Sequence, residues 1–151
     1  MKRFDFSLQK VLDFRDFQKK QAEAELGKAA GEEAKIERTL KMVAESRVKT
    51  IREADEMKNI NDLYNAQLYF RLLDQRRDAL NEELARAKIV TEEKRTVMRE
   101  AMKKSKVLEN LRDHRKEAWK KEQLKIEDDA IDDIVTGLYS NSVSNPKIEK
   151  R

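Results

Sequence analysis

Apolar residues recur along the first third of the chain at alternating spacings of four and three residues. The run covers positions 8, 12, 15, 19, 22, 26, 29, 33, 36, 40, 43, 47, 50, 54 and 57, and ten of these fifteen hold Leu, Ile, Val, Met or Ala. This alternation is the heptad pattern of a coiled-coil helix. Ser7 is a possible N-cap, and Phe6 and Val11 have the spacing of a hydrophobic staple. We therefore expect a first helix over about 7–57.

The heptad pattern stops at 58–62, where three Asn or Asp residues compete for backbone hydrogen bonds. A turn is expected there, with Asn61 or Asp62 as the N-cap of a second helix over about 62–136. The pattern resumes at 63, 66, 70, 73, 77, 80, 84, 87, 91, 94, 98, 101, 105 and 108, with ten of fourteen positions apolar. A short link between two such helices predicts an antiparallel all-α hairpin.

The predicted turn also fixes which residues face each other. If it centres near residue 60, the numbers of facing residues should add to about 120. This register places apolar residues opposite each other: Leu12 by Leu108, Ala22 by Met98, Ile36 by Leu84, and Leu40 by Leu80.

The second helix is expected to be longer than the first, so that it overhangs its partner by roughly 25 to 30 Å. Gly137 is expected to end it as a left-handed C′ residue, which makes 1–139 a single coiled-coil domain and 140–151 a disordered tail. The overhang would leave a set of apolar residues without an intramolecular partner: Trp119, Leu124, Ile126, Ala130, Ile131, Ile134, Val135 and Leu138.

Charge is abundant, at 42% of residues, and it is segregated near the end of the chain. Positions 94–126 hold twelve Lys and Arg against five acids, whereas 127–133 hold five acids and no base. Such an end is suited to docking a partner of complementary charge, although charged outer faces are also ordinary in coiled coils. The net charge is only +4, so the composition gives little support to nucleic-acid binding.

Residues for catalysis or cofactor binding are missing from the sequence. There is no Cys, the single His114 has no second ligand near it, and the three Gly residues do not form a phosphate-binding loop. With 3 Gly and 1 Pro, a packed α/β enzyme is also excluded. We expect no enzyme, no cofactor and no metal. No apolar stretch approaches the ~18 residues of a membrane span, so a soluble protein without a signal peptide is expected.

Two segments resemble the flagellar FliJ family, small antiparallel coiled-coil proteins of the flagellar type III export apparatus. The first runs from Phe4 to Arg15, with the pattern Phe-x-Phe-x-Leu-Gln-x-Val-Leu-Asp-x-Arg. The second is Leu108-Glu109-x-Leu111-x-x-x-Arg115-x-Glu117, followed by Glu122, Glu127 and Ile131-Asp132-Asp133. The resemblance covers nearly the whole chain, from Phe4 to about Val135.

The resemblance implies a cytoplasmic protein, peripheral to the inner membrane at the flagellar base. It implies binding to the hexameric export ATPase, promotion of its assembly and activity, and links to the cytoplasmic domain of the export-gate membrane protein and to export chaperones. A monomer that acts as a stalk is expected. The residues implied for ATPase binding are Phe4, Phe6, Arg15, Arg112, Arg115, Trp119, Asp128, Asp129, Asp132 and Asp133, and those implied for the export gate are Tyr69, Leu73, Arg76 and Leu80.

Two other functions remain open from the sequence. The unpaired apolar residues near the end of the chain could drive formation of a homodimeric structural adaptor, which light scattering would detect as a concentration-dependent mass. The basic run could make a nucleic-acid-binding arm, whose affinity would fall steeply with salt. For Leu73 and Leu80, a position in the helix interface is an alternative to partner contact.

Overall fold

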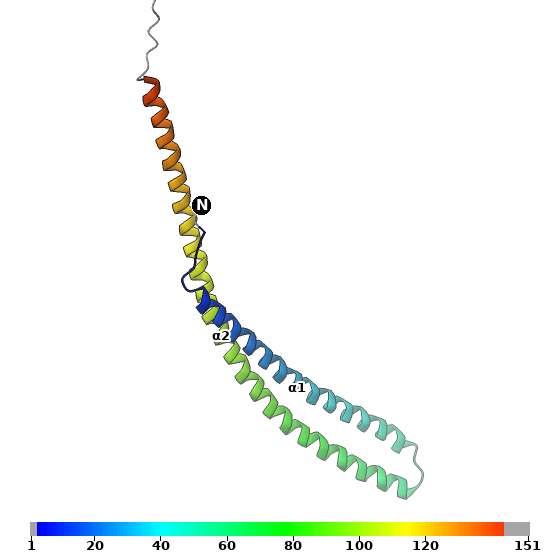
Figure 1. Ribbon diagram of the computed structural model, residues 1–151. Helices are drawn as coiled ribbons and strands as arrows, with labels where there is room; N and C mark the ends of the chain where they lie inside the picture. Colours follow the sequence, from blue (N-terminus) through cyan, green and yellow to red (C-terminus); the bar gives the residue numbers. More distant parts are fainter. Residues whose placement is uncertain (1–2, 144–151) are drawn as a thin grey trace, which may run out of the picture. The chain divides into compact units, whose positions relative to one another are not determined.

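The structure is a computed structural model that describes residues 3–143, and within them all regular structure is helical (Figure 1). Helix α1 spans Gln9–Asp55 and helix α2 spans Ile60–Val143, with lengths of 47 and 84 residues. The prediction of an all-α protein with two long helices that pack together is confirmed. The described residues form two units: a terminal unit of 3–12 and 106–143, and a turn unit of 13–105.

The predicted heptad positions are the positions that the two helices bury. All fifteen positions from 8 to 57 are buried or half-buried, as are twelve of the fourteen from 63 to 108. Leu63 and Arg77 are the two exceptions. In the turn unit the most deeply buried apolar residues are Ala22, Ala66, Leu73 and Leu80. The heptad spacing therefore located the core, because one side of each helix must face the other helix.

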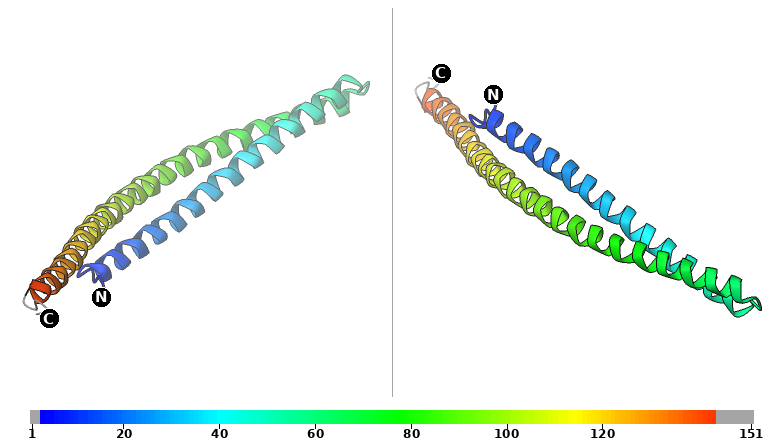
Figure 2. Two further views of the ribbon diagram at one scale, coloured as in Figure 1. Left: turned by 90° about the horizontal axis from the view of Figure 1, so that it is seen from above. Right: turned by 90° about the horizontal axis from the view of Figure 1, so that it is seen from below.

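Three polar contacts join α1 to α2 in the turn unit, where both ribbons run side by side (Figure 2). Residues early in α1 contact residues late in this part of α2, so the helices are antiparallel here. The contacts also agree with the predicted register. They are Ser105 Oγ donating to Asp16 Oδ1, Lys94 Nζ at 3.8 Å from Glu25 Oε2, and Arg47 Nε donating to Asp74 Oδ1 at 3.0 Å.

Two buried threonines at heptad positions are satisfied within their own helices. Thr50 and Thr91 are buried, and their hydroxyls donate to the carbonyl oxygens of Ser46 and Ala87 at 2.9 and 3.0 Å. Among the described residues, no buried side-chain nitrogen or oxygen lacks a hydrogen-bond partner. The narrow interface therefore tolerates hydroxyls, because a satisfied buried donor avoids the desolvation cost of an unpaired one.

The cap of α2 lies slightly earlier than the sequence predicted. The backbone N–H of Asn61 donates to the side-chain oxygen of Asn59 at 3.0 Å, which is the N-cap contact of a helix that begins at Ile60. The expectation of Asn61 or Asp62 as the cap is therefore wrong. The first of the competing side chains in the turn captures the free amide, and the helix begins directly after it.

The end of α2 also differs from the prediction. The helix runs through Gly137 to Val143, and no described Gly has a positive φ. A glycine ends a helix only when it adopts the left-handed conformation, and here it stays right-handed like its neighbours. The predicted disordered tail is thus wrong for 140–143, and its remaining part, 144–151, lies outside the described residues.

Candidate functional site

In the terminal unit, the segment before α1 lies along α2 (Figure 1). We call residues 3–8 the N-terminal strap. The ring of Phe4 packs against the ring of Trp119, with centroids 5.8 Å apart and planes tilted by 54°. Phe6 is 5% exposed and Leu12 1%, so the start of the chain is anchored by apolar burial. The strap thus brings the two ends of the predicted family pattern together.

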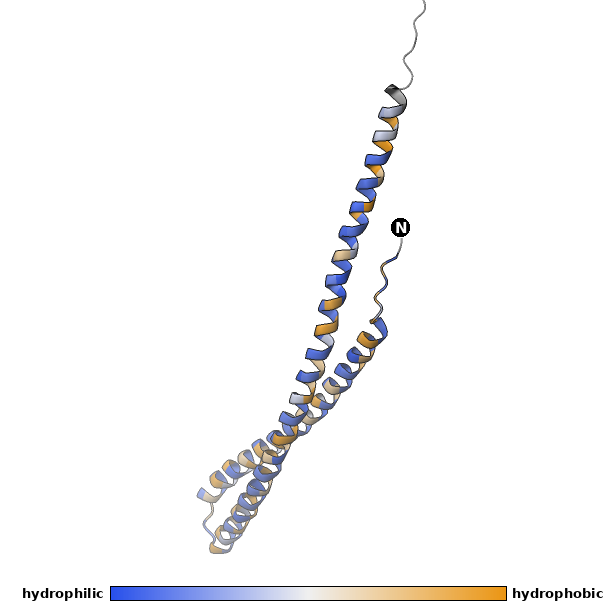
Figure 3. Cartoon of the chain, turned by 90° about the vertical axis from the view of Figure 1, so that its left-hand side faces the viewer, coloured by the Kyte–Doolittle hydropathy of each residue, from blue (hydrophilic) through white to orange (hydrophobic). Residues whose placement is uncertain are grey.

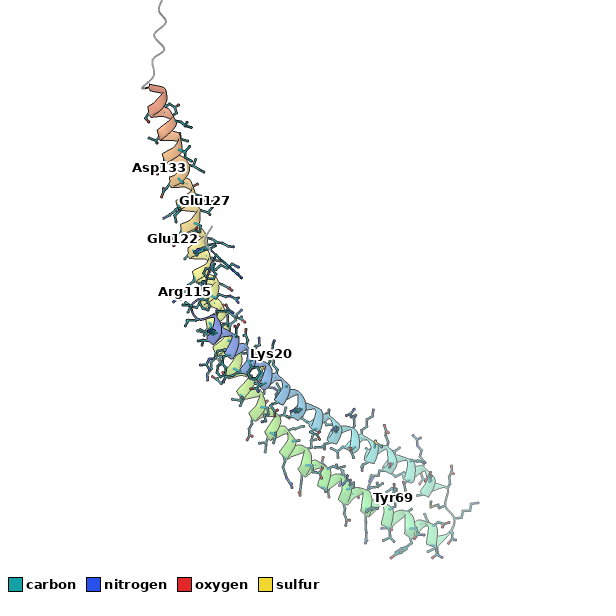
Figure 4. The ribbon with its side chains drawn as sticks, in the orientation of Figure 1. Lys20, Tyr69, Arg115, Glu122, Glu127 and Asp133 are labelled. Carbon is teal, nitrogen blue, oxygen red and sulfur yellow. The ribbon has the colours of Figure 1, made fainter. Side chains whose placement is uncertain are left out.

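Arg115 is the polar anchor of the N-terminal strap, and Figure 4 labels it on α2. Its guanidinium carbon lies 5.8 Å from the centroid of the Phe6 ring, within the range of a cation–π contact. Its Nη1 donates to the Ser7 hydroxyl at 3.3 Å. The sequence predicts Ser7 as a helix cap; in the structure α1 begins at Gln9, and the Ser7 hydroxyl accepts a hydrogen bond from α2 that no local pattern in the sequence signals.

A groove of about 630 Å³ runs between the strap and α2. Within it, Arg112 forms an ion pair with the adjacent Asp113 at 3.1 Å, which reduces the positive charge that Arg112 presents. The mixture of aromatic rings and both signs of charge suits contact with another protein surface. The residues that line the groove are Arg3, Phe4, Asp5, Phe6, Gln9, Arg112, Asp113 and Lys116.

Five of the ten residues predicted for ATPase binding therefore gather at one place: Phe4, Phe6, Arg112, Arg115 and Trp119. Arg15 does not belong to this cluster. It lies in the turn unit, where its Nη1 donates to Gln18 Oε1 at 3.1 Å on the same helix.

The four predicted aspartates lie further along α2, at positions 128, 129, 132 and 133, and all four are exposed. Asp133 is labelled in Figure 4. The same part of α2 exposes large apolar side chains, among them Leu124, Ile131 and Leu138. Acidic and apolar groups thus share one solvent-exposed length of helix.

The residues predicted for the export gate lie in the turn unit and divide into two kinds. Leu73 and Leu80 are 8% and 2% exposed, so they belong to the helix interface. Tyr69 and Arg76 are exposed and available to a partner. The four residues follow one another at spacings of four, three and four, so they form one stripe along α2. One edge of this stripe lies in the helix interface, and the other edge is exposed.

Other chemistry is limited in the part of the chain that the structure describes. It contains no group of three or more potential metal ligands among His, Cys, Asp and Glu. No helix of residues 3–143 has the length and apolar character needed to cross a membrane. The hydrogen bond from Lys28, together with the positive charges of Lys28 and Lys94, holds the pKa of the Glu25 carboxyl below its ordinary value.

Comparison with known proteins supplies one further finding. The family model described as flagellar FliJ protein matches residues 4–144, which is nearly the whole chain. No curated protein and no solved structure matches it.

Proposed function

Because the chain belongs to the flagellar FliJ protein family, whose members are coiled-coil proteins associated with flagellar export, we propose that it acts as a stalk of the export ATPase. In this proposal it binds the hexameric ATPase ring and promotes the assembly and activity of that ring. It works as a monomer in the cytoplasm, at the membrane-associated base of the flagellum. It has no catalytic role of its own.

The observation that carries the proposal is the contact of the N-terminal strap with α2. The Phe4 ring packs at a tilt against Trp119, and Arg115 contacts both the Phe6 ring and the Ser7 hydroxyl. A stalk that enters a ring needs a firm end that joins both termini of the coiled coil. The aromatic pair and the guanidinium contacts provide such an end, because they tie residues far apart in sequence into one surface.

We further propose that α2 extends beyond the strap as an overhang that enters the ring. All described side chains from Leu124 to Ser140 are exposed, and Asp128, Asp129, Asp132 and Asp133 are among them. Exposed apolar and charged groups on a single helix are suited to contact with another protein. Arg15 completes the proposed set from the turn unit.

The turn unit is proposed to contact the cytoplasmic domain of the export-gate membrane protein through Tyr69 and Arg76. Leu73 and Leu80 act there from the core, because they fix the position of α2 beneath the exposed pair. Export chaperones are proposed as further partners of the protein.

The test uses the purified export ATPase from the same organism, with and without this protein. Its steady-state rate of ATP hydrolysis and the size of its assembly are measured together. Stimulation of the rate with a larger share of hexamer supports the stalk function. An unchanged rate and an unchanged assembly, with both proteins folded and mixed at high concentration, would contradict it.

Substitutions locate the contact. We expect Trp119→Ala to weaken the stimulation by about twofold to tenfold, the equivalent of an aromatic packing contact of about 0.5–1.5 kcal/mol. Phe17→Ala is the matched control, because Phe17 is an aromatic residue of α1 that is 56% exposed. Equal losses from both variants would mean that the strap has no special role.

The export-gate contact is tested separately by binding of the protein to the purified cytoplasmic domain of the gate protein. Tyr69→Ala is expected to weaken binding. Tyr64→Ala is the control, because Tyr64 is also exposed on α2 but points to a different side of the helix, five residues away. If Tyr64→Ala has the larger effect, the predicted gate surface is misplaced.

A further inference from the structure

Five apolar residues form a stripe along one side of α2 near its end: Leu124, Ile131, Ile134, Val135 and Leu138. We call it the C-terminal stripe. Its last four members have the spacing i, i+3, i+4 and i+7, and Leu124 precedes Ile131 by two turns, so all five share one side of the helix. Their exposed fractions range from 47% for Val135 to 66% for Leu138. In Figure 3, orange and blue residues alternate along this part of α2.

The stripe has a negative border. Glu127 and Asp128 lie between Leu124 and Ile131, three or four residues from each, so these two acids interrupt the stripe there. Asp128 lies at the edge of the stripe that Val135 continues two turns later. Asp132 continues the same border one turn later. Asp129 and Asp133, by contrast, are each two residues from Ile131, which places them on the other side of the helix. No Lys or Arg occurs in 127–140, so the part of the stripe from Ile131 to Leu138 has only negative charge beside it. Lys120 and Lys121 lie one turn before Leu124, at the other end of the stripe.

This charge pattern selects among possible occupants. In an antiparallel dimer centred on Ile131, Asp128 of one chain would lie near Asp132 of the other, and in a parallel dimer each Asp128 would face its own copy. A shift that brings the acids over the basic residues of a second copy would move the apolar side chains away from each other. A dimer could therefore bury the apolar stripe or pair opposite charges, but not both at once. If the stripes pack together, repulsion between like charges opposes the dimer.

We propose that the C-terminal stripe docks an amphipathic helix of a partner protein, whose apolar side is bordered by Lys or Arg. The apolar sides of the two helices would pack together, and the basic border would meet Asp128 and Asp132. Helix-in-groove and coiled-coil recognition combine apolar anchors with flanking charges in this way. The identity of the partner as the export ATPase rests on the proposed function, whereas the chemistry of its helix rests on the stripe alone.

The experiment measures binding of two synthetic helical peptides to the full-length protein by fluorescence anisotropy. Both peptides carry three heptads with Leu at the core positions, and their flanking positions hold Lys in one peptide and Glu in the other. We expect the Lys peptide to bind about tenfold more tightly at low ionic strength, with the difference shrinking as salt is added. Binding of neither peptide, or equal binding of both, would overturn the proposal.

Two variants test the position of the contact with the same change of net charge. Asp128→Lys is expected to weaken binding of the Lys peptide by at least about fivefold, because it reverses the border of the stripe. Glu122→Lys should change it by less than about twofold, because Glu122 is exposed two residues before Leu124 and lies away from the stripe. Equal losses would show that only the overall charge matters, and would overturn the proposal.

Two further measurements separate this inference from its rivals. Sedimentation of the protein alone is expected to show a monomer, and a dimer that Ile131→Ser dissolves would assign the stripe to a second copy instead. The ATPase assay distinguishes the two proposals. Stimulation that survives Asp128→Lys unchanged would keep the stalk function and remove the stripe from it. Binding of the Lys peptide without any stimulation of the ATPase would support the docking role of the stripe and contradict the stalk function.

Discussion

Leu80 tests whether the heptad interface of the turn unit holds the two helices together. It is 2% exposed, and it is also one of the residues proposed to support the export-gate surface. In Leu80→Ala, three buried side-chain carbon atoms are removed. Full burial of a Leu side chain contributes about 1.5–3 kcal/mol, and the cavity adds to the loss, so that buried Leu→Ala changes cost about 2–5 kcal/mol.

The lower half of that range applies here. A two-helix interface is one layer thick, so water and neighbouring side chains can fill the space that the substitution leaves. We therefore expect a loss of about 2–3 kcal/mol in the free energy of unfolding. For a chain of 151 residues this corresponds to a fall in Tm of roughly 4–12 °C.

The assay is urea and thermal unfolding followed by circular dichroism at a helical wavelength. Leu72→Ala is the control, because it makes the same change on the same helix at a side chain that is 59% exposed. It should alter the free energy of unfolding by no more than about 0.5 kcal/mol. If the two variants lose stability equally, or if Leu80→Ala loses under about 1 kcal/mol, the heptad interface is not the source of stability.

Three further predictions concern single features of the helices. Gly137→Ala should stabilise the helix by about 0.5–1 kcal/mol, since an added Cβ meets nothing within 4 Å; a destabilised variant in thermal unfolding would mean a left-handed C-cap. A double-mutant cycle of Ser105→Ala and Asp16→Ala should give a coupling of about 1–2 kcal/mol from urea unfolding, and additive losses would contradict the cross-helix hydrogen bond. Because the folded-state pKa of Glu25 is lowered, its small contribution is present above the unfolded-state pKa and is lost as pH falls through the folded value; Glu25→Gln should flatten that acidic part of the stability profile.

The heptad spacing alone predicted the residues of the helix interface. Ala22, Leu73 and Leu80 are buried where the 4,3 alternation placed them. The antiparallel register followed as well, as the pairing of Glu25 with Lys94 shows. These features can be predicted from sequence because backbone geometry fixes the periodicity of a helix. Two helices with the same heptad spacing can pack through their apolar positions in only a few registers.

The helix ends were less predictable. Gly137 can serve as a C-cap or lie in a helix interior, because a glycine without a Cβ can adopt both the left-handed and the right-handed conformation. The structure keeps it helical, and α2 continues to Val143. In the same way, Asn59 takes the cap role that Asn61 and Asp62 also suited, since each of these side chains can accept from a free backbone N–H in the turn.

The sequence by itself determined the elements, the core and the acidic and apolar character of the end of α2. Only the tertiary structure decided what the first residues do. Phe4 and Trp119 are far apart in sequence, and their ring contact depends on the path of a segment that has no periodic pattern. The same is true of Arg115, which has a solvent-exposed position on a charged helix and reaches Phe6 and Ser7 only because the N-terminal strap passes beside it. Long-range contacts of this kind depend on side-chain packing, which local sequence patterns do not encode.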